Sequence, residues 1–259
     1  MQQQNALCQP LAAGEPVFGA RAKTHAPALI EVYGSLGLDF VWLDFEHGGP
    51  SPADAQHLEH CCRAAAVGDT ELLVRLPKGE PTLVRKLLDT GVRNVLIPRV
   101  EDVDDIQPAL KAARFDYDGG PGQRGFAGAR VSGWGDHPAS YARLEDENVL
   151  VGAQIESLTG LENLSEILAL PALGFVQIGH GDLAISMGRP MQADHEDVQA
   201  AISTILEHCL EADVPVGRVP ADVADAREAR DAGYQILRLG DEVEGARSLL
   251  TDRLDALKR

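Results

Sequence analysis

Short apolar runs alternate with amphipathic stretches along this chain, as they do in proteins built from repeated strand–helix units. The apolar runs are nearly continuous, as expected for parallel strands that are buried on both faces. They span residues 16–22, 39–45, 71–76, 94–100, 150–156, 174–179, 214–220 and 234–240. Helical patterns lie between most of them, and several begin near Ser, Thr, Asp or Pro and end near Gly. These patterns span residues 26–37, 51–66, 80–91, 102–114, 159–170, 195–212 and 221–233.

Eight alternating strands and helices in 259 residues predict one α/β fold, a (β/α)8 TIM barrel, with residues 1–259 forming a single domain. A doubly wound open sheet is the alternative, but no GxGxxG motif follows the first strand. Residues 115–146 interrupt the alternation with a Gly-rich irregular stretch. Loops of this length in a compact domain usually serve function or assembly, so we expect one of these roles here.

The chain is acidic and poor in lysine. Its net charge is −17, and its 23 basic residues comprise 18 Arg and 5 Lys. This charge argues against nucleic acids and anionic membranes as partners. Because the acidic residues are dispersed rather than gathered in a tail, we hypothesise a halophilic protein whose surface charges are screened by high salt.

The sequence also indicates a cytoplasmic protein. No run of about 18 apolar residues predicts a membrane span, and the first residues lack the basic and apolar regions of a signal peptide. The cysteines form no CxxC pair, so a thiolate zinc site is not expected. We expect free, buried thiols in a reducing compartment at Cys8, Cys61, Cys62 and Cys209.

Polar residues gather where the predicted strands end, which is where the active sites of TIM barrels lie. The second strand, in FVWLDFEHGG, changes there from apolar residues to Asp44, Glu46 and His47. The third, fifth and sixth strands are followed or ended by Arg75, Glu156, His180, Gly181 and Asp182. We expect all of these residues to meet at one mouth of the barrel.

The residue types at these strand ends suit enolate chemistry on a 2-oxo acid. Glu156 and Asp182 offer hard oxygen ligands for Mg²⁺ or Mn²⁺, with Co²⁺ as a further candidate. His47 can act as a general base near neutral pH. Arg75 can stabilise a developing oxyanion. The backbone amides of residues 179–182 can hold a carboxylate, helped by a helix N-terminus if a helix begins there.

The order and spacing of these motifs resemble the HpcH/HpaI aldolase family, the metal-dependent class II pyruvate aldolases. The resemblance runs from about residue 10 to 245. Its motifs are D-x-E-H at 44–47, the Arg of LLVRLP at Arg75, the Asp of LLDTGV at Asp89, G-x-R-G at 122–125, Q-x-E-S at 154–157 and I-G-x-x-D-L at 178–183. The resemblance implies a homo-hexamer in which the C-terminal helix, about residues 241–259, is swapped with a neighbouring subunit.

The resemblance also implies a role for each motif residue. Glu156 and Asp182 would hold the divalent metal, and Arg75 would bind the keto oxygen of pyruvate. His47 would be the acid/base partner in carbon–carbon cleavage, oriented by Asp89.

Other motif residues would surround the substrate. Those expected to line its site are Asp44, Gln154, Gly181 and Asp182, the last two through backbone amides that take the pyruvate carboxylate. Glu46 would act on the site through water. His180 departs from the family pattern, which has Pro there. It is either a loop residue that fills the Pro position or a contact to the substrate carboxylate or to metal-bound water.

We therefore expect a metal-dependent aldolase that cleaves a small-molecule 2-oxo-3-deoxy (4-hydroxy) acid reversibly to pyruvate and an aldehyde, as the resemblance implies. A sugar-derived acid is favoured over a diacid from aromatic degradation, because the loop at 48–53 adds no basic residue for a distal carboxylate. Two alternatives stay open. A CoA-thioester lyase of the citrate lyase β or malyl-CoA type would need a basic cluster for the CoA phosphates, and a non-catalytic barrel would be expected to lose some of these residues.

Overall fold

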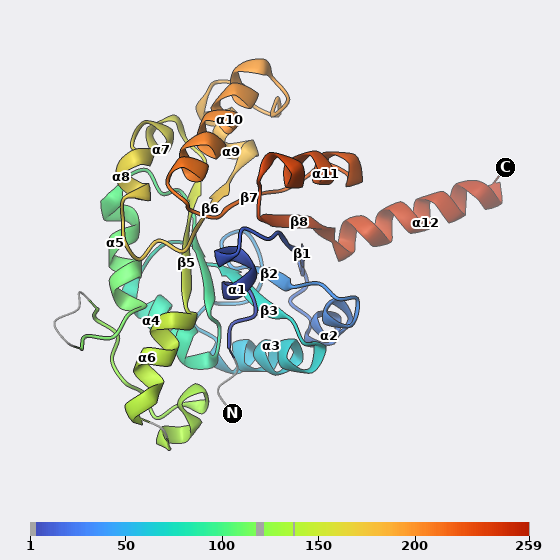
Figure 1. Cartoon of the computed structure of the whole chain (residues 1–259). Coiled ribbons are helices and arrows are strands. Elements are labelled where there is room, and N and C mark those ends of the chain that lie inside the picture. Colours follow the sequence, from blue (N-terminus) through green and yellow to red (C-terminus); the bar gives the residue numbers. More distant parts are fainter. Residues whose placement is uncertain (1–3, 118–121, 137, 259) are drawn as a thin grey trace.

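The chain folds into a closed barrel of parallel strands surrounded by helices (Figure 1). The computed structural model describes residues 4–117, 122–136 and 138–258. Its strands are β1 Val17–Arg21, β2 Phe40–Asp44, β3 Glu71–Arg75, β4 Asn94–Ile97, β5 Leu150–Ile155, β6 Phe175–Ile178, β7 Val216–Arg218 and β8 Ile236–Asp241. β1 pairs with β8, for example at Val17 and Ile236, so the sheet closes on itself. The predicted TIM barrel is confirmed, and the open-sheet alternative is wrong.

The predicted helical segments form helices close to their expected bounds. They are α2 Pro27–Ser35, α3 Ala55–Gly68, α4 Pro81–Thr90, α5 Val103–Ala112, α7 Leu158–Glu162, α8 Leu164–Leu168, α10 Glu196–Glu211 and α11 Val223–Ala232. Side-chain caps explain several of their starts. Asp54 accepts a hydrogen bond from the His57 amide before α3, and Asp102 forms a capping box with Asp105 at α5. Gly91, in a left-handed conformation, ends α4.

Three further helices lie at the ends of the barrel and of the chain. They are α1 Cys8–Ala12, α9 His180–Ser186 and α12 Glu242–Lys258. Leu7 and Leu11 bury their side chains in the apolar cluster inside the barrel, so α1 closes the end where the strands begin. α9 follows β6 directly, as the sequence suggested. α12 extends away from the barrel (Figure 1), and none of its residues is buried.

The stretch expected to be irregular contains two helical segments, η1 Arg130–Gly135 and α6 Pro138–Asn148. The prediction of an irregular loop is therefore wrong for α6. This helix is held by Glu145, whose side chain is 1% exposed and lies 3.0 Å from Arg93 and 3.4 Å from Arg124. Buried ion pairs between distant segments leave no hydrophobic periodicity in the sequence, so the pattern could not predict this helix.

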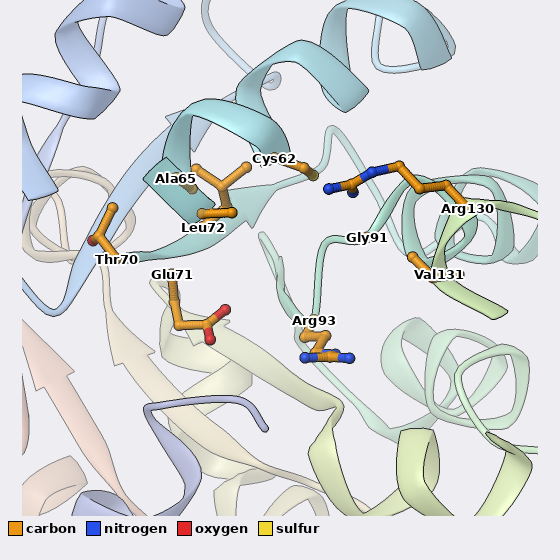
Figure 2. Close-up of a pocket in the computed structure, with 10 residues that line it drawn as sticks. Cys62, Ala65, Thr70, Glu71, Leu72, Gly91, Arg93, Arg130 and Val131 are labelled. Atoms are coloured by element: carbon orange, nitrogen blue, oxygen red, sulfur yellow. The ribbon is translucent and has the colours of Figure 1, made fainter. Parts of the chain in front are cut away.

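η1 borders a cavity of about 320 Å³ at the barrel end where β3 begins (Figure 2). Two arginines, Arg93 and Arg130, lie beside it with Cys62. Burial raises the pKa of the Cys62 thiol to about 12, which makes it a poor nucleophile. The residues predicted for the active site do not line this cavity. All four cysteines are free, as expected, and those that are buried are Cys61, Cys62 and Cys209.

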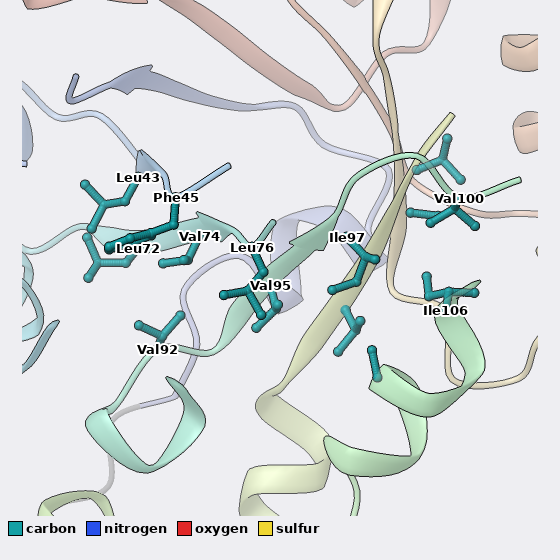
Figure 3. Close-up of a cluster of buried hydrophobic side chains, with 14 of the residues drawn as sticks. Leu43, Phe45, Leu72, Val74, Leu76, Val92, Val95, Ile97, Val100 and Ile106 are labelled. Atoms are coloured by element: carbon teal, nitrogen blue, oxygen red, sulfur yellow. The ribbon is translucent and has the colours of Figure 1, made fainter. Parts of the chain in front are cut away.

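The apolar strand residues are buried on both faces of the barrel wall. Outward-facing side chains such as Leu43 and Val74 pack in the layer between the strands and the helices (Figure 3). Inward-facing side chains such as Phe40 and Leu73 fill the barrel together with Phe175. Burial on both faces explains why the second strand is apolar at nearly every position before Asp44. No helix in the described residues is both long and apolar enough to span a membrane.

The barrel interior requires a residue without a side chain at Gly152. A Cβ atom at this position would overlap the ring of Phe175. We expect Gly152→Ala to lower the free energy of unfolding by about 1–3 kcal/mol, because the ring can move only by disturbing the packed interior. Gly245→Ala is the control, since a Cβ there meets no atom within 4 Å and alanine favours a helix. Urea unfolding of both variants checks this, and equal stabilities would contradict it.

Candidate active site

The carboxyl ends of the strands surround a cavity of about 230 Å³. Its walls come from β1, β2, β3, β5, β6 and β8 and from the turn between β6 and α9. The residues predicted for the site that line it are Arg75, Gln154, His180, Gly181 and Asp182. The barrel mouth therefore brings together residues that lie far apart in the sequence.

Arg75 and Asp44 form a buried ion pair that joins the ends of β3 and β2. Arg75 Nε donates to Asp44 Oδ1 at 2.9 Å, and Nη2 donates to Oδ2 at 2.6 Å. This two-point contact fixes the plane of the guanidinium. Burial by itself would raise the pKa of Asp44, but the hydrogen bonds and the charge of Arg75 outweigh burial and hold that pKa below its ordinary value.

The turn after β2 places Glu46 and His47 beside this ion pair. Asp44 Oδ1 accepts hydrogen bonds from the amides of Glu46 at 3.1 Å and His47 at 3.4 Å. Glu46 Oε2 lies 2.9 Å from Arg75 Nη1 and 3.5 Å from His47 Nε2. The His47 side chain is 64% exposed, so its ring lies at the opening of the barrel and is accessible to a substrate.

Gln154 connects Arg75 to the buried carboxylate of Glu156. Its Oε1 accepts from Arg75 Nη1 at 3.4 Å, and its Nε2 donates to Glu156 Oε2. Glu156 Oε1 accepts from the amide of Arg99 at 2.8 Å. Gly179 leaves the space for this carboxylate, because a side chain there would overlap Glu156.

Glu156 and Asp182 fit the donor chemistry of a divalent cation site. Burial raises the pKa of Glu156 to about 7, and the charges of Asp182 and Glu46 contribute to the shift. A bound cation would offset both the burial and the repulsion between these carboxylates. No three His, Cys, Asp or Glu side chains of the described residues form a metal-binding group. A cation at this site would therefore take further ligands from water or substrate.

Asp89 and His47 lie at opposite ends of the barrel in the single chain. Asp89 lies near the end of α4, and the helices of a TIM barrel run antiparallel to its strands, so this helix ends at the opposite mouth. The Asp89 carboxylate is 3.8 Å from Arg124 Nη2. Contacts within the chain therefore do not make the expected pair in which Asp89 orients His47.

The turn after β6 places His180 on the cavity wall. Burial lowers the pKa of His180 to about 4, and the charges of Arg218 and Arg238 contribute, so the ring is neutral at neutral pH. Its Nε2 atom is buried and has no hydrogen-bond partner among the described residues. Gly181 and Asp182 are exposed in the first turn of α9, where backbone amides have no acceptor within the helix.

Three charged or aromatic residues of the cavity wall were not predicted: Arg21, Trp42 and Arg238. All three point into the barrel, and Arg21 ends β1 as Arg75 ends β3. Alternate residues of a strand point to the same face, so the sequence pattern places these residues inside the barrel. Arg238 lies two residues after the inward-facing Ile236, so a charge at an interior position could have been noticed.

The Asp44–Arg75 pair has a consequence for stability. Asp44→Asn should lower the free energy of unfolding at pH 7 by about 2 kcal/mol, because Arg75 loses a buried charged partner. The pKa of Asp44 is lowered in the folded protein. The ionised carboxylate therefore stabilises the folded state above about pH 4, and this stabilisation is lost as pH falls further. Unfolding measured from pH 3 to 8 checks this, with the exposed Asp231→Asn as control. A difference between wild type and Asp44→Asn that does not change with pH would contradict it.

The chain is similar in sequence and structure to characterised enzymes. The sequence profile of the HpcH/HpaI aldolase/citrate lyase family matches residues 21–248. A hydroxypyruvate/pyruvate aldolase of Paraburkholderia phytofirmans is 32% identical over 92% of each chain. A 5-keto-4-deoxy-D-glucarate aldolase of an Enterobacter species is 31% identical over 96% of this chain and 95% of the relative. A crystal structure of a family protein from Burkholderia cenocepacia J2315 matches with a TM-score of 0.90 and 30% identity, over 98% of this chain and 100% of that one. The chain therefore belongs to the HpcH/HpaI aldolase/citrate lyase family.

Proposed function

We propose that this protein is a metal-dependent aldolase that cleaves a 2-oxo-3-deoxy acid with a 4-hydroxyl group, reversibly, to pyruvate and an aldehyde. The observation that carries the proposal is the grouping at the barrel mouth, where Arg75 links Asp44 and Glu46 to Gln154 and Glu156. Family membership supports the same reaction class. Relatives at 32% and 31% identity are named as aldolases.

Arg75 is suited to bind the keto oxygen of the substrate. Cleavage of the bond between C3 and C4 leaves a pyruvate enolate, whose negative charge develops on that oxygen. Two carboxylates hold the guanidinium in place, so little reorganisation is needed when the charge appears. Burial by itself would lower the pKa of Arg75, but Asp44 and Glu46 raise it above its ordinary value, and the side chain stays charged.

His47 is suited to move the proton of the 4-hydroxyl group. Its ring lies at the opening of the barrel, 3.5 Å from Glu46, and is free to meet the aldehyde half of a substrate. Removal of the hydroxyl proton lets the C4–O bond become a carbonyl while the C3–C4 bond breaks. The enolate is then protonated at C3, which releases pyruvate.

Glu156 and Asp182 would hold the divalent metal, with Mg²⁺ and Mn²⁺ as the first candidates and Co²⁺ as a further one. A bound ion supplies Lewis-acid polarisation of the keto group. The hydrogen bonds from the Arg99 amide and Gln154 orient the Glu156 carboxylate. The amides of Gly181 and Asp182 are suited to take the carboxylate of the 2-oxo acid.

The substrate class stays a proposal that rests on relatives. The aldolase names of those relatives favour a keto-deoxy sugar acid over a CoA thioester. A non-catalytic barrel is disfavoured because every charged residue expected at the strand ends is present.

Assembly and environment follow the same reasoning. We propose that α12 packs on a neighbouring copy within a homo-hexamer, because its apolar side chains lack cover in the single chain. These are Val243, Leu249, Leu250, Leu254 and Leu257. We also propose a salt-adapted protein, because the acidic residues are dispersed along the chain, and a cytoplasmic one, because its cysteines are free thiols. The mass in solution and the unfolding midpoint, each measured in low and molar KCl, test these proposals; a monomer or a salt-insensitive midpoint would count against them.

Removal of divalent metal should abolish the reaction. We expect purified protein with Mn²⁺ or Mg²⁺ to release pyruvate from 2-keto-3-deoxy pentonates, hexonates or diacids, and EDTA to suppress this release reversibly. A coupled lactate dehydrogenase assay in high salt measures the pyruvate. Undiminished activity after thorough chelation would refute the metal dependence, and no pyruvate from any of these acids would refute the proposed reaction.

His47→Ala should lower kcat for cleavage by about 100-fold or more, because proton transfer from the 4-hydroxyl loses its base. The fold should be retained, since the His47 side chain is 64% exposed and its ion pair within the described residues is with Glu46. His60→Ala is the control, because His60 is exposed on α3, away from the cavity. Steady-state kinetics and circular dichroism check both variants. Wild-type kcat in His47→Ala would remove the residue from the mechanism.

A further inference from the structure

One wall of the active-site cavity is formed by arginines that the proposed reaction does not use. Arg21 ends β1, Arg238 lies on β8, and both line the cavity with Arg75. Trp42 lies on β2, where it pairs in register with Arg21. The guanidinium carbons of Arg238 and Arg75 are 5.5 and 5.8 Å from the centroid of the Trp42 ring. Two of the three cations therefore lie against one aromatic side chain, and Arg21 lies on the strand next to it.

These arginines are unequally supplied with anionic partners. Arg75 has close contacts to Asp44 and Glu46, whereas the ion pair of Arg21 within the described part of the chain is with Asp44, at 3.5 Å. Among the described residues, Arg238 has no hydrogen bond or ion pair, and its Nε atom is buried without a partner. The Nε atom of Arg21 is also buried and unpartnered.

The acid on β8, Asp241, forms its close ion pair with a lysine and not with Arg238. Asp241 is 2.6 Å from Lys23, which satisfies that carboxylate. Burial lowers the pKa of Arg238 to about 10. The charges of Arg21 and Arg75 add to this shift, and those of Asp241 and Asp44 oppose it without offsetting it. A buried cation without an anion is costly, so this wall retains a capacity for one more negative group.

Other residues of the cavity are suited to bind the carboxylate and the keto oxygen of a 2-oxo acid. Under the proposed function, the carboxylate of the acid meets the amides of Gly181 and Asp182, and its keto oxygen meets Arg75. Arg21 and Arg238 are then left for a group on the other half of the substrate. The loop at 48–53, where a basic residue was sought in the sequence, is not the only part of the chain that can supply one.

We infer that Arg21 and Arg238 bind an anionic group on the aldehyde half of the substrate, either a carboxylate or a phosphate. This inference rests on the proposed aldolase reaction and narrows its substrates to aldehydes that carry their own negative charge. Planar guanidinium groups bind both kinds of anion through paired hydrogen bonds. In the synthetic direction, pyruvate loses a C3 proton, its C3 bonds to the aldehyde carbon, and the aldehyde oxygen gains a proton.

The experiment compares matched charged and neutral acceptors in aldol addition with pyruvate and Mn²⁺. The pairs are glyoxylate with glycolaldehyde, and D-glyceraldehyde 3-phosphate with D-glyceraldehyde. Wild type should prefer the charged member of at least one pair by about tenfold or more in kcat/KM, as expected for a desolvated charged hydrogen bond. The preferred pair tells carboxylate from phosphate recognition.

Arg238→Met should lose that preference, because methionine keeps the packing on Trp42 and removes the charge. Arg238→Lys should restore part of it, and Arg230→Met, at the exposed end of α11, should keep it in full. Arg21→Met provides an independent test if Arg238→Met does not fold. Equal losses for charged and neutral acceptors, or a wild type without preference in either pair, would overturn the inference.

Deuterium exchange at C3 of pyruvate separates this inference from the proposed function. Exchange needs only the pyruvate half of the site. Relative to wild type, Arg238→Met should therefore lose less of its exchange rate than of its rate of aldol addition to the charged acceptor. An equal fall would place Arg238 at the pyruvate carboxylate and overturn the inference. No exchange and no product in wild type would refute the aldolase proposal itself. In that case, calorimetry with glyoxylate and with inorganic phosphate tests the anion site without catalysis. Arg238→Met should bind them more weakly than wild type, and equal affinities would overturn the anion site.

Discussion

Pairing of β1 with β8 closes the sheet, and this closure determines where every polar group of the site lies. A closed parallel barrel directs all its strand ends to one opening. Arg75 thereby contacts Asp44, 31 residues away, and Gln154, 79 residues away. The interior below is filled by side chains such as Phe40 and Phe175, so the opening has a rigid floor. Charged groups at the mouth are held by a scaffold whose stability comes from apolar packing.

The mouth separates charges into two regions that face each other. Glu156 and Asp182 make one side acidic, and the burial of Glu156 gives it a raised pKa of about 7. Arg21 and Arg238 make the other side basic. Arg75 stands between them with its charge balanced by Asp44 and Glu46. This division suits a substrate that brings oxygen ligands to a cation at one end and a negative group at the other.

The sequence predicted the barrel well because its strands are buried on both faces and so differ in pattern from its helices. It predicted Arg75 and Gln154 at the cavity because strand ends and family motifs coincide there. It could not predict α6, which depends on buried ion pairs of Glu145 with distant segments. The family motif implied that Asp89 orients His47, and contacts within one chain do not make this pair. Arg238 was not predicted because it lies at an interior-facing position within β8, whereas the predicted site residues were taken from strand ends and family motifs.

The side-chain amide of Gln154 has one favourable orientation in the site. Its amide oxygen accepts a hydrogen bond from Arg75, and its amide nitrogen donates one to Glu156. Turning the amide by half a rotation would set oxygen against a carboxylate and nitrogen against a guanidinium. Gln154 is therefore held in one orientation by its two charged neighbours, and this neutral side chain connects the cationic Arg75 to the anionic Glu156.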